Sequence, residues 1–160
     1  MKPSLYLETT VVSYLTARPS RDLVTAARQQ LTSDWWEFRR QDYDIFVSPL
    51  VLEEAERGDP AAAEARMSVL RGLKVEPVNA EAYDLVDHLM REVSLSATVV
   101  NDAIHIACAA TSGAEFLMTW NFKHIANPVL RDKIGSACRQ AGYEPAVICT
   151  PEELLEGAEE

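Results

Sequence analysis

Long hydrophobic runs are missing from this sequence, and cysteines are few. No apolar stretch approaches the roughly 18 residues that cross a bilayer, so we expect no membrane span. The first residues, MKPSLYLETT, lack the apolar core and cleavage site of a signal peptide, which favours a cytoplasmic protein. Cys108, Cys138 and Cys149 are odd in number and far apart, and we interpret them as buried free thiols.

Several motifs for phosphate binding and hydrolysis are also absent. The chain has no GxxxxGK(S/T) or GxGxxG loop to hold phosphates, and no GxSxG turn to expose a nucleophilic serine. With three histidines and no paired cysteines it cannot form a zinc finger or a metalloprotease pattern. What remains is phosphoryl chemistry assisted by a metal that oxygen ligands can hold.

Basic residues are fewer than acidic ones: the chain has 15 Lys and Arg against 25 Asp and Glu, which gives a net charge of −10. This balance argues against strong nonspecific binding of nucleic acid over the whole surface. It fits a solvated acidic surface, and it also fits a docking face for a basic partner. Nucleic acid is still a possible substrate if a divalent metal lies between clustered carboxylates and the phosphate.

The sequence does contain the alternation of an α/β protein. Its 160 residues, 48% hydrophobic and 25% charged, fit one domain over residues 1–160. Short β-rich runs alternate with segments of helical period, which predicts a parallel sheet covered by helices. The five runs are SLYLE, DIFVS, LKVEP, EFLMTW and PAVICT.

Prolines and glycines mark the helix boundaries. Asp59, Asn127 and Thr150 each precede a proline that would take the first helical position. Gly72 and Gly142 lie where two helices should stop, each just before a strand. These signals predict where the chain passes between helix and strand.

Acidic side chains recur where predicted strands meet predicted helices. Glu8 ends the first strand, Glu54 lies about two turns into the helix after the second strand, and Asp102 occupies the first turn of a helix. Asn121 ends the fourth strand. The functional crevice of an open α/β sheet lies at the carboxyl ends of its strands, so these side chains should converge. Three carboxylates from separate junctions favour a Mg²⁺ or Mn²⁺ site.

Two of the carboxylates also have a purely structural explanation. Asp102 could be an ordinary helix-terminus charge, and Glu8 could be a strand-end charge that reaches water. In the helix that Ser48 would cap, Glu54 adjoins the apolar face, whereas Glu53 turns further away. Glu54 is therefore the better candidate of that pair.

His105 follows Asp102 by one helical turn in NDAIHIACAA, where the other residues are mostly small or apolar. Such a helix is buried, so the pair must be satisfied by each other, by neighbouring backbone, or by a metal and its waters. A core histidine satisfied within the fold is favoured over one that supports a metal site.

Four ordered segments resemble the motifs of PIN domains: YLETTVVSYL, VSPLVLEEAERGDP, NDAIHIACAA and FLMTWNFKHIAN. The later ICTPEEL is similar to the VapC-like toxin branch. The resemblance implies a three-layer α/β/α sandwich with a parallel sheet of about five strands. It also implies a Mg²⁺- or Mn²⁺-dependent ribonuclease, commonly a homodimeric toxin restrained by a small antitoxin protein.

Carried over residue by residue, the resemblance assigns the metal ligands to Glu8, to Glu54 (through the ExxxG match to Gly58) and to Asp102. It places Asn121 as the fourth catalytic residue. Family members usually have aspartate at the first position and often at the fourth. Glutamate reaches one methylene further and asparagine is neutral, so the site could be weakened. A weakened PIN fold that binds RNA or an antitoxin is therefore the alternative function.

Other residues would support the site or contact RNA. Thr10 and Thr119 would contact phosphate or position the ligands, with His105 as a further supporting residue. Lys123 and His124 could meet the RNA backbone or form a solvated loop. Arg18, Arg21 and Arg28 could bind phosphate or an acidic antitoxin segment, but a solvated helix face is the favoured interpretation. An RNA-stacking surface and packing against the core or a dimer partner explain equally well a mixed aromatic and basic group: Trp35, Trp36, Phe38, Arg39 and Arg40.

Overall fold

The strands of the computed structural model, which describes residues 1–94, 96 and 99–156, form one parallel sheet. Its order is β3-β2-β1-β4-β5. The strands are β1 (Ser4–Leu7), β2 (Asp44–Val47), β3 (Lys74–Val75), β4 (Phe116–Met118) and β5 (Val147–Cys149). All five predicted β-rich runs therefore form strands, and every neighbouring pair is parallel as expected.

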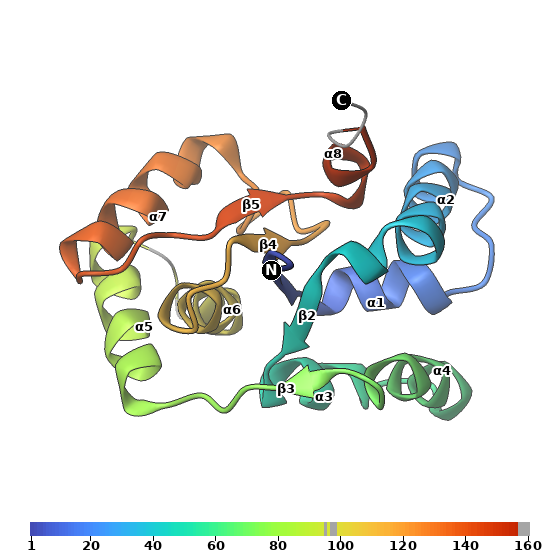
Figure 1. Cartoon of the computed structure of the whole chain (residues 1–160), viewed down its shortest axis with the longest axis horizontal. Helices are drawn as coiled ribbons and strands as arrows, with labels where there is room; N and C mark the ends of the chain where they lie inside the picture. The colour runs from blue at the N-terminus through green and yellow to red at the C-terminus, as the bar shows by residue number, and fades with distance from the viewer. Residues whose placement is uncertain (95, 97–98, 157–160) are drawn as a thin grey trace.

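Helices cover both faces of this sheet (Figure 1). α5, α6 and α7 pack together on one side, and α1, α2 and α8 lie on the other, where α1 also contacts α3 and α4. The helices are α1 (Thr9–Thr16), α2 (Leu23–Phe38), the 3-10 helix η1 (Arg40–Asp42), α3 (Pro49–Ala55), α4 (Pro60–Leu70), α5 (Ala80–Glu92), α6 (Val100–Thr111), α7 (Pro128–Gln140) and α8 (Pro151–Glu156). This arrangement confirms the predicted three-layer sandwich.

The central strand β1 is the middle of the hydrophobic core. Leu5, Tyr6 and Leu7 are fully buried, and β1 pairs with β2 on one side and β4 on the other. A strand buried on both faces is typical of a parallel sheet covered by helices. The carboxylate of Glu8, which follows β1, is therefore held at the edge of the core.

Most helix starts follow the sequence signals. The side chains of Asp59 and Asn127 accept hydrogen bonds from backbone amides in the first turns of α4 and α7. Thr150 and Glu153 bond to each other's backbone amides at the start of α8. Ser48 is the exception: it occupies the N-cap position of α3, but its hydroxyl makes no capping bond. It bonds to a side chain of β1 instead.

α6 is the most deeply buried helix near the site. Ala103, Ala107 and Ala109 have no exposed surface, as the apolar sequence predicts. The cysteines are all buried free thiols, which confirms their interpretation. Burial raises the pKa of Cys108 to about 11. No helix in the described ranges is both long enough and apolar enough to cross a membrane.

Candidate active site

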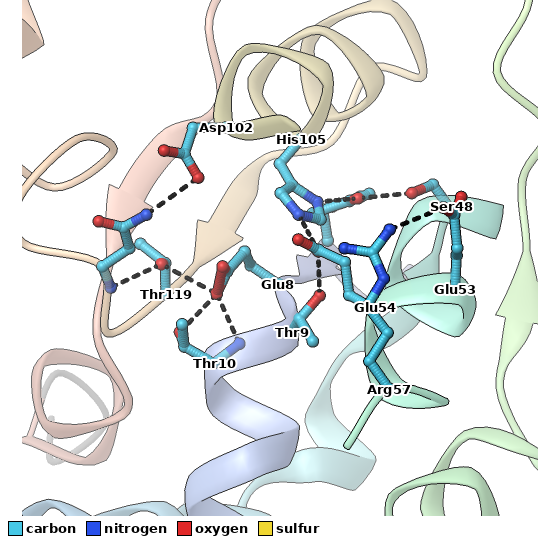
Figure 2. Close-up of polar contacts among 12 residues, drawn as sticks. Glu8, Thr9, Thr10, Ser48, Glu53, Glu54, Arg57, Asp102, His105 and Thr119 are labelled. Carbon is cyan, nitrogen blue, oxygen red and sulfur yellow. Dashed lines mark hydrogen bonds and ion pairs between the residues drawn. The ribbon is translucent and has the colours of Figure 1, made fainter. Parts of the chain in front are cut away.

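The acidic side chains gather at the carboxyl edge of the sheet (Figure 2). Glu8, Ser48 and Thr119 directly follow β1, β2 and β4. Because these strands are parallel neighbours, the residues after them lie side by side. α3 brings Glu54 to this edge and α6 brings Asp102. We refer to Glu8, Glu54 and Asp102 as the site carboxylates.

Glu8 is buried, with 3% of its surface exposed, and donors surround one of its oxygens. Its Oε2 accepts from the Thr10 amide at 2.8 Å, from the Thr10 hydroxyl, and from the Thr119 hydroxyl at 3.2 Å. Burial raises the pKa of Glu8, although the charge of His105 and the bonds from Thr10 oppose that shift. The predicted supporting threonines thus contact the carboxylate itself.

Glu54 points inward from α3, as predicted. Its Oε1 lies 2.6 Å from His105 Nε2 and accepts from the Thr9 hydroxyl at 2.7 Å. Burial by itself would raise the pKa of Glu54. The hydrogen bond and the charge of His105, together with the hydrogen bond from Thr9, outweigh burial, so the pKa of Glu54 lies below its ordinary value. The neighbouring Glu53 is exposed and pairs with Arg57 at 2.8 Å, away from the site.

His105 links Glu54 to the core through a chain of hydrogen bonds. It is fully buried, and its Nδ1 lies 2.7 Å from the Tyr6 hydroxyl, which lies 2.8 Å from the Ser48 hydroxyl. A carboxylate only accepts, so His105 Nε2 carries a proton and donates the hydrogen bond to Glu54 Oε1. Nδ1 accepts from the Tyr6 hydroxyl when the ring is neutral and donates to it when the ring is charged. His105 is thus satisfied within the fold, and it also orients a site carboxylate.

Asp102 makes its contact with Asn121 rather than with His105. Asn121 Nδ2 donates to Asp102 Oδ1 at 3.1 Å, and Asn121 Oδ1 accepts from the His124 amide at 3.1 Å. Burial raises the pKa of Asp102, while the charges of His124 and His105 lower it. An aspartate at position 121 would lack the amide donor and repel Asp102, which explains why asparagine fits here.

The carboxylate oxygens of the site are ligands that suit a hard cation, although the side chains are not arranged around one. Glu8, Glu54 and Asp102 each use one carboxylate oxygen in the bonds above, and the other oxygen accepts no hydrogen bond from any described residue. Carboxylate oxygens are what Mg²⁺ and Mn²⁺ prefer. As the side chains stand, however, no group of three or more Asp, Glu, His or Cys in the described part of the chain could hold a metal ion.

The predicted contact residues around the site have mixed placements. Lys123 is exposed and His124 is partly buried beside Asn121. Arg28 lies over aromatic rings next to the site, whereas Arg18 and Arg21 are exposed elsewhere on the surface. Of the adjacent tryptophans, Trp35 is fully buried and Trp36 is partly exposed under the Arg40 guanidinium.

Sequence reasoning missed three residues that hold the site together. Tyr6 and Ser48 complete the hydrogen-bond chain behind His105, and Thr9 bonds to Glu54. A tyrosine in an otherwise aliphatic central strand was the available signal, because a buried phenol needs a hydrogen-bond partner.

A comparison with known protein families identifies the family of this chain. The PIN domain family profile matches residues 5–126, which include all three site carboxylates and Asn121. The chain belongs to the PIN domain family. No curated protein sequence matches it.

Solved structures share the fold of this PIN domain. VapC20 of Mycobacterium tuberculosis, described as a toxin that cleaves the sarcin-ricin loop, is 20% identical with a TM-score of 0.58, over 78% of this chain and 95% of that one. VapBC2 of Rickettsia felis, bound to a promoter DNA fragment, is 18% identical with a TM-score of 0.57, over 79% and 94%. FitAB bound to a DNA fragment is 12% identical with a TM-score of 0.58, over 92% and 95%.

Proposed function

We propose that this PIN domain is a Mg²⁺- or Mn²⁺-dependent endoribonuclease that hydrolyses RNA phosphodiesters. The observation that carries the proposal is the arrangement of Glu8, Glu54 and Asp102, which come from three junctions and each present an oxygen that no described residue hydrogen-bonds. VapC20, which shares the fold, is described as a toxin that cleaves the sarcin-ricin loop. We further propose that the chain is the toxin of a type II toxin–antitoxin pair, held by a small antitoxin and forming a homodimer.

In this mechanism the three site carboxylates would hold the ion through their free oxygens. A bound Mg²⁺ or Mn²⁺ would lower the pKa of water for attack on the phosphodiester and stabilise the developing charge. Thr10 and Thr119 hold Glu8 in place through its other oxygen. Asn121 holds Asp102 in the same way, so its bonds make it a positioning residue.

The alternative is a weakened PIN fold that binds RNA or an antitoxin without cutting. Two observations favour it. The pKa of the buried Glu8 is raised, which disfavours the charged form that a cation needs. No group of three ligands in the described ranges is arranged for an ion as it stands.

Cleavage of a mixed-sequence single-stranded RNA tests the proposal. We expect cutting with Mn²⁺ that disappears with EDTA and in Asp102→Asn, which keeps the acceptor for Asn121 but removes the charge. Asp87→Asn is the matched control, because Asp87 is an exposed carboxylate on α5, and it should cut like the natural chain. Equal inactivity of all folded proteins would contradict the nuclease and favour the binding module.

The pair Glu8→Asp with Asn121→Asp distinguishes a weakened site from a working one. If the natural chain is inactive and the double variant gains Mn²⁺-dependent cutting, the two departures from the family pattern have weakened the site. If the natural chain already cuts and the double variant does not improve on it, the natural site works as it stands.

A further inference from the structure

An exposed aromatic ring lies directly beside the site with an arginine stacked against it. Phe122 is 41% exposed, and the Arg28 guanidinium lies 4.8 Å from the centre of its ring. The same guanidinium lies 5.6 Å from the Trp120 ring, which contacts Phe122 edge to face at 6.0 Å. Arg28 and Phe122 together form a surface in which a guanidinium lies over an exposed aromatic ring, and we call it the stacking surface.

Buried contacts hold this surface in place. Trp120 is 5% exposed, its indole NH donates to the Thr32 hydroxyl at 2.8 Å, and its ring packs against Tyr14. The Phe122 amide donates to the Trp120 carbonyl at 3.0 Å. An exposed ring that is fixed in advance loses little conformational entropy when it binds a partner.

The stacking surface and the site carboxylates share one short turn of the chain. Asn121, which donates to Asp102, stands between Trp120 and Phe122. The Trp120 amide donates at 2.9 Å to the Thr10 hydroxyl, the same hydroxyl that donates to Glu8. A ligand on Phe122 therefore lies next to the acidic edge of the sheet.

We infer that Arg28 and Phe122 stack one unpaired base of a single-stranded RNA and so place the neighbouring phosphodiester at the site carboxylates. Successive bases of single strands stack on aromatic and arginine planes without regard to sequence. The positive charge of Arg28 and the exposed Lys123 next to Phe122 match the phosphates that flank such a base. This inference rests on the proposed function, because it names what the same site binds.

Binding is tested with a labelled single-stranded RNA of about ten nucleotides, titrated in EDTA so that the strand stays whole. Phe122→Ala should weaken binding about tenfold, as expected for the loss of one stacked base. Phe122→Tyr keeps an aromatic plane and should bind like the natural chain. Phe38→Ala is the matched control, because Phe38 is 69% exposed beside Arg39 and Arg40 but lies at the end of α2, before β2 begins.

The same strand in a duplex separates stacking from charge, since its bases are already paired. Phe122→Ala should leave duplex binding unchanged, and all variants should melt like the natural chain. The inference is overturned if Phe122→Ala binds single-stranded RNA normally, or if it loses affinity for single-stranded and duplex RNA equally. It is also overturned if the variant changes only the oligomeric state. It is also overturned if the natural chain binds no single-stranded RNA.

Cleavage with Mn²⁺ is scored separately from binding. A chain that cuts RNA while Phe122→Ala binds normally would overturn the stacking surface and leave the nuclease standing. A chain that shows Phe122-dependent binding of single strands but never cuts would support stacking and contradict the nuclease.

Discussion

Glu8 is an ionisable side chain in one of the most buried positions of the molecule. Three donors from Thr10 and Thr119 converge on one of its oxygens, yet burial still raises its pKa. The folded state therefore favours the protonated acid more than the unfolded chain does. Stability from this group is full below the unfolded pKa and is lost as pH rises through the folded pKa.

Glu8→Gln should remove that pH dependence. Glutamine keeps a carbonyl to accept from Thr10 and Thr119 but cannot ionise, so in EDTA we expect it to be more stable than the natural chain at pH 7. The difference should shrink as pH falls toward the unfolded pKa of about 4.3. Urea unfolding at several pH values measures it, with the exposed Glu53→Gln as control. Parallel stability curves for Glu8→Gln and the natural chain would contradict the pKa shift.

At this scale the sequence predicted which residues meet, but it could not predict how they bond. The positions of Glu8 and Asp102 follow from a strand end and a helix start, and that of Glu54 follows from the apolar face of its helix, which are local signals. Asn121 was predicted to end the fourth strand, but β4 stops at Met118 and Asn121 lies in the loop that follows. Their partners depend on side-chain directions across long separations, as when the Tyr6 hydroxyl reaches a histidine 99 residues away. No periodicity encodes such a contact.

At the scale of elements, helix starts and stops followed from short-range chemistry. Proline fixes φ and a preceding Asp, Asn or Thr accepts the free amides, so α4, α7 and α8 begin as predicted. Ser48 failed as a capping side chain because a buried phenol competes for its hydroxyl. Tertiary contacts override local preference where an element end is buried at the site.

Two glycines that follow helices differ in backbone conformation and make a matched pair. Gly142 has φ +91° after α7, whereas Gly72 after α4 lies outside the left-handed region. An added Cβ meets nothing within 4 Å at either position. We expect Gly142→Ala to lose about 1–2 kcal/mol of unfolding free energy through backbone strain, and Gly72→Ala to gain about 0.4–1 kcal/mol. Equal effects in urea unfolding would contradict this backbone explanation.

At the scale of the whole molecule, the excess of acidic residues and the closeness of the site carboxylates both add negative charge that repels further ionisation at the site. Burial is the main cause of the raised pKa of Glu8 and Asp102, and the charge of Glu54 adds to both shifts. The charge of His105 opposes this repulsion at both carboxylates and that of His124 at Asp102, but both pKa values stay raised, and the chain as a whole carries a net charge of −10. A divalent cation would relieve it.

Mn²⁺ should therefore stabilise the fold. We expect a gain of about 2.7 kcal/mol at an ion concentration near 100 times the Kd, because the folded state alone would bind it. Thermal melting with and without Mn²⁺ measures the gain. Asp102→Asn should lose most of it and Asp87→Asn should keep it. An unchanged Tm at millimolar Mn²⁺ would contradict the metal site.

The hydrogen-bond chain behind His105 decides which site carboxylate can be mutated with the least damage to the fold. Replacing Glu54 would leave the Nε2 proton of the fully buried His105 without an acceptor. It would also disturb the hydrogen bonds that join His105 to Tyr6 and Tyr6 to Ser48. Among the described residues, Asn121 is the one whose side chain bonds to the carboxylate of the half-buried Asp102. An uncharged variant for testing the proposed metal site is therefore best made at Asp102, where the mutation leaves the centre of the molecule intact.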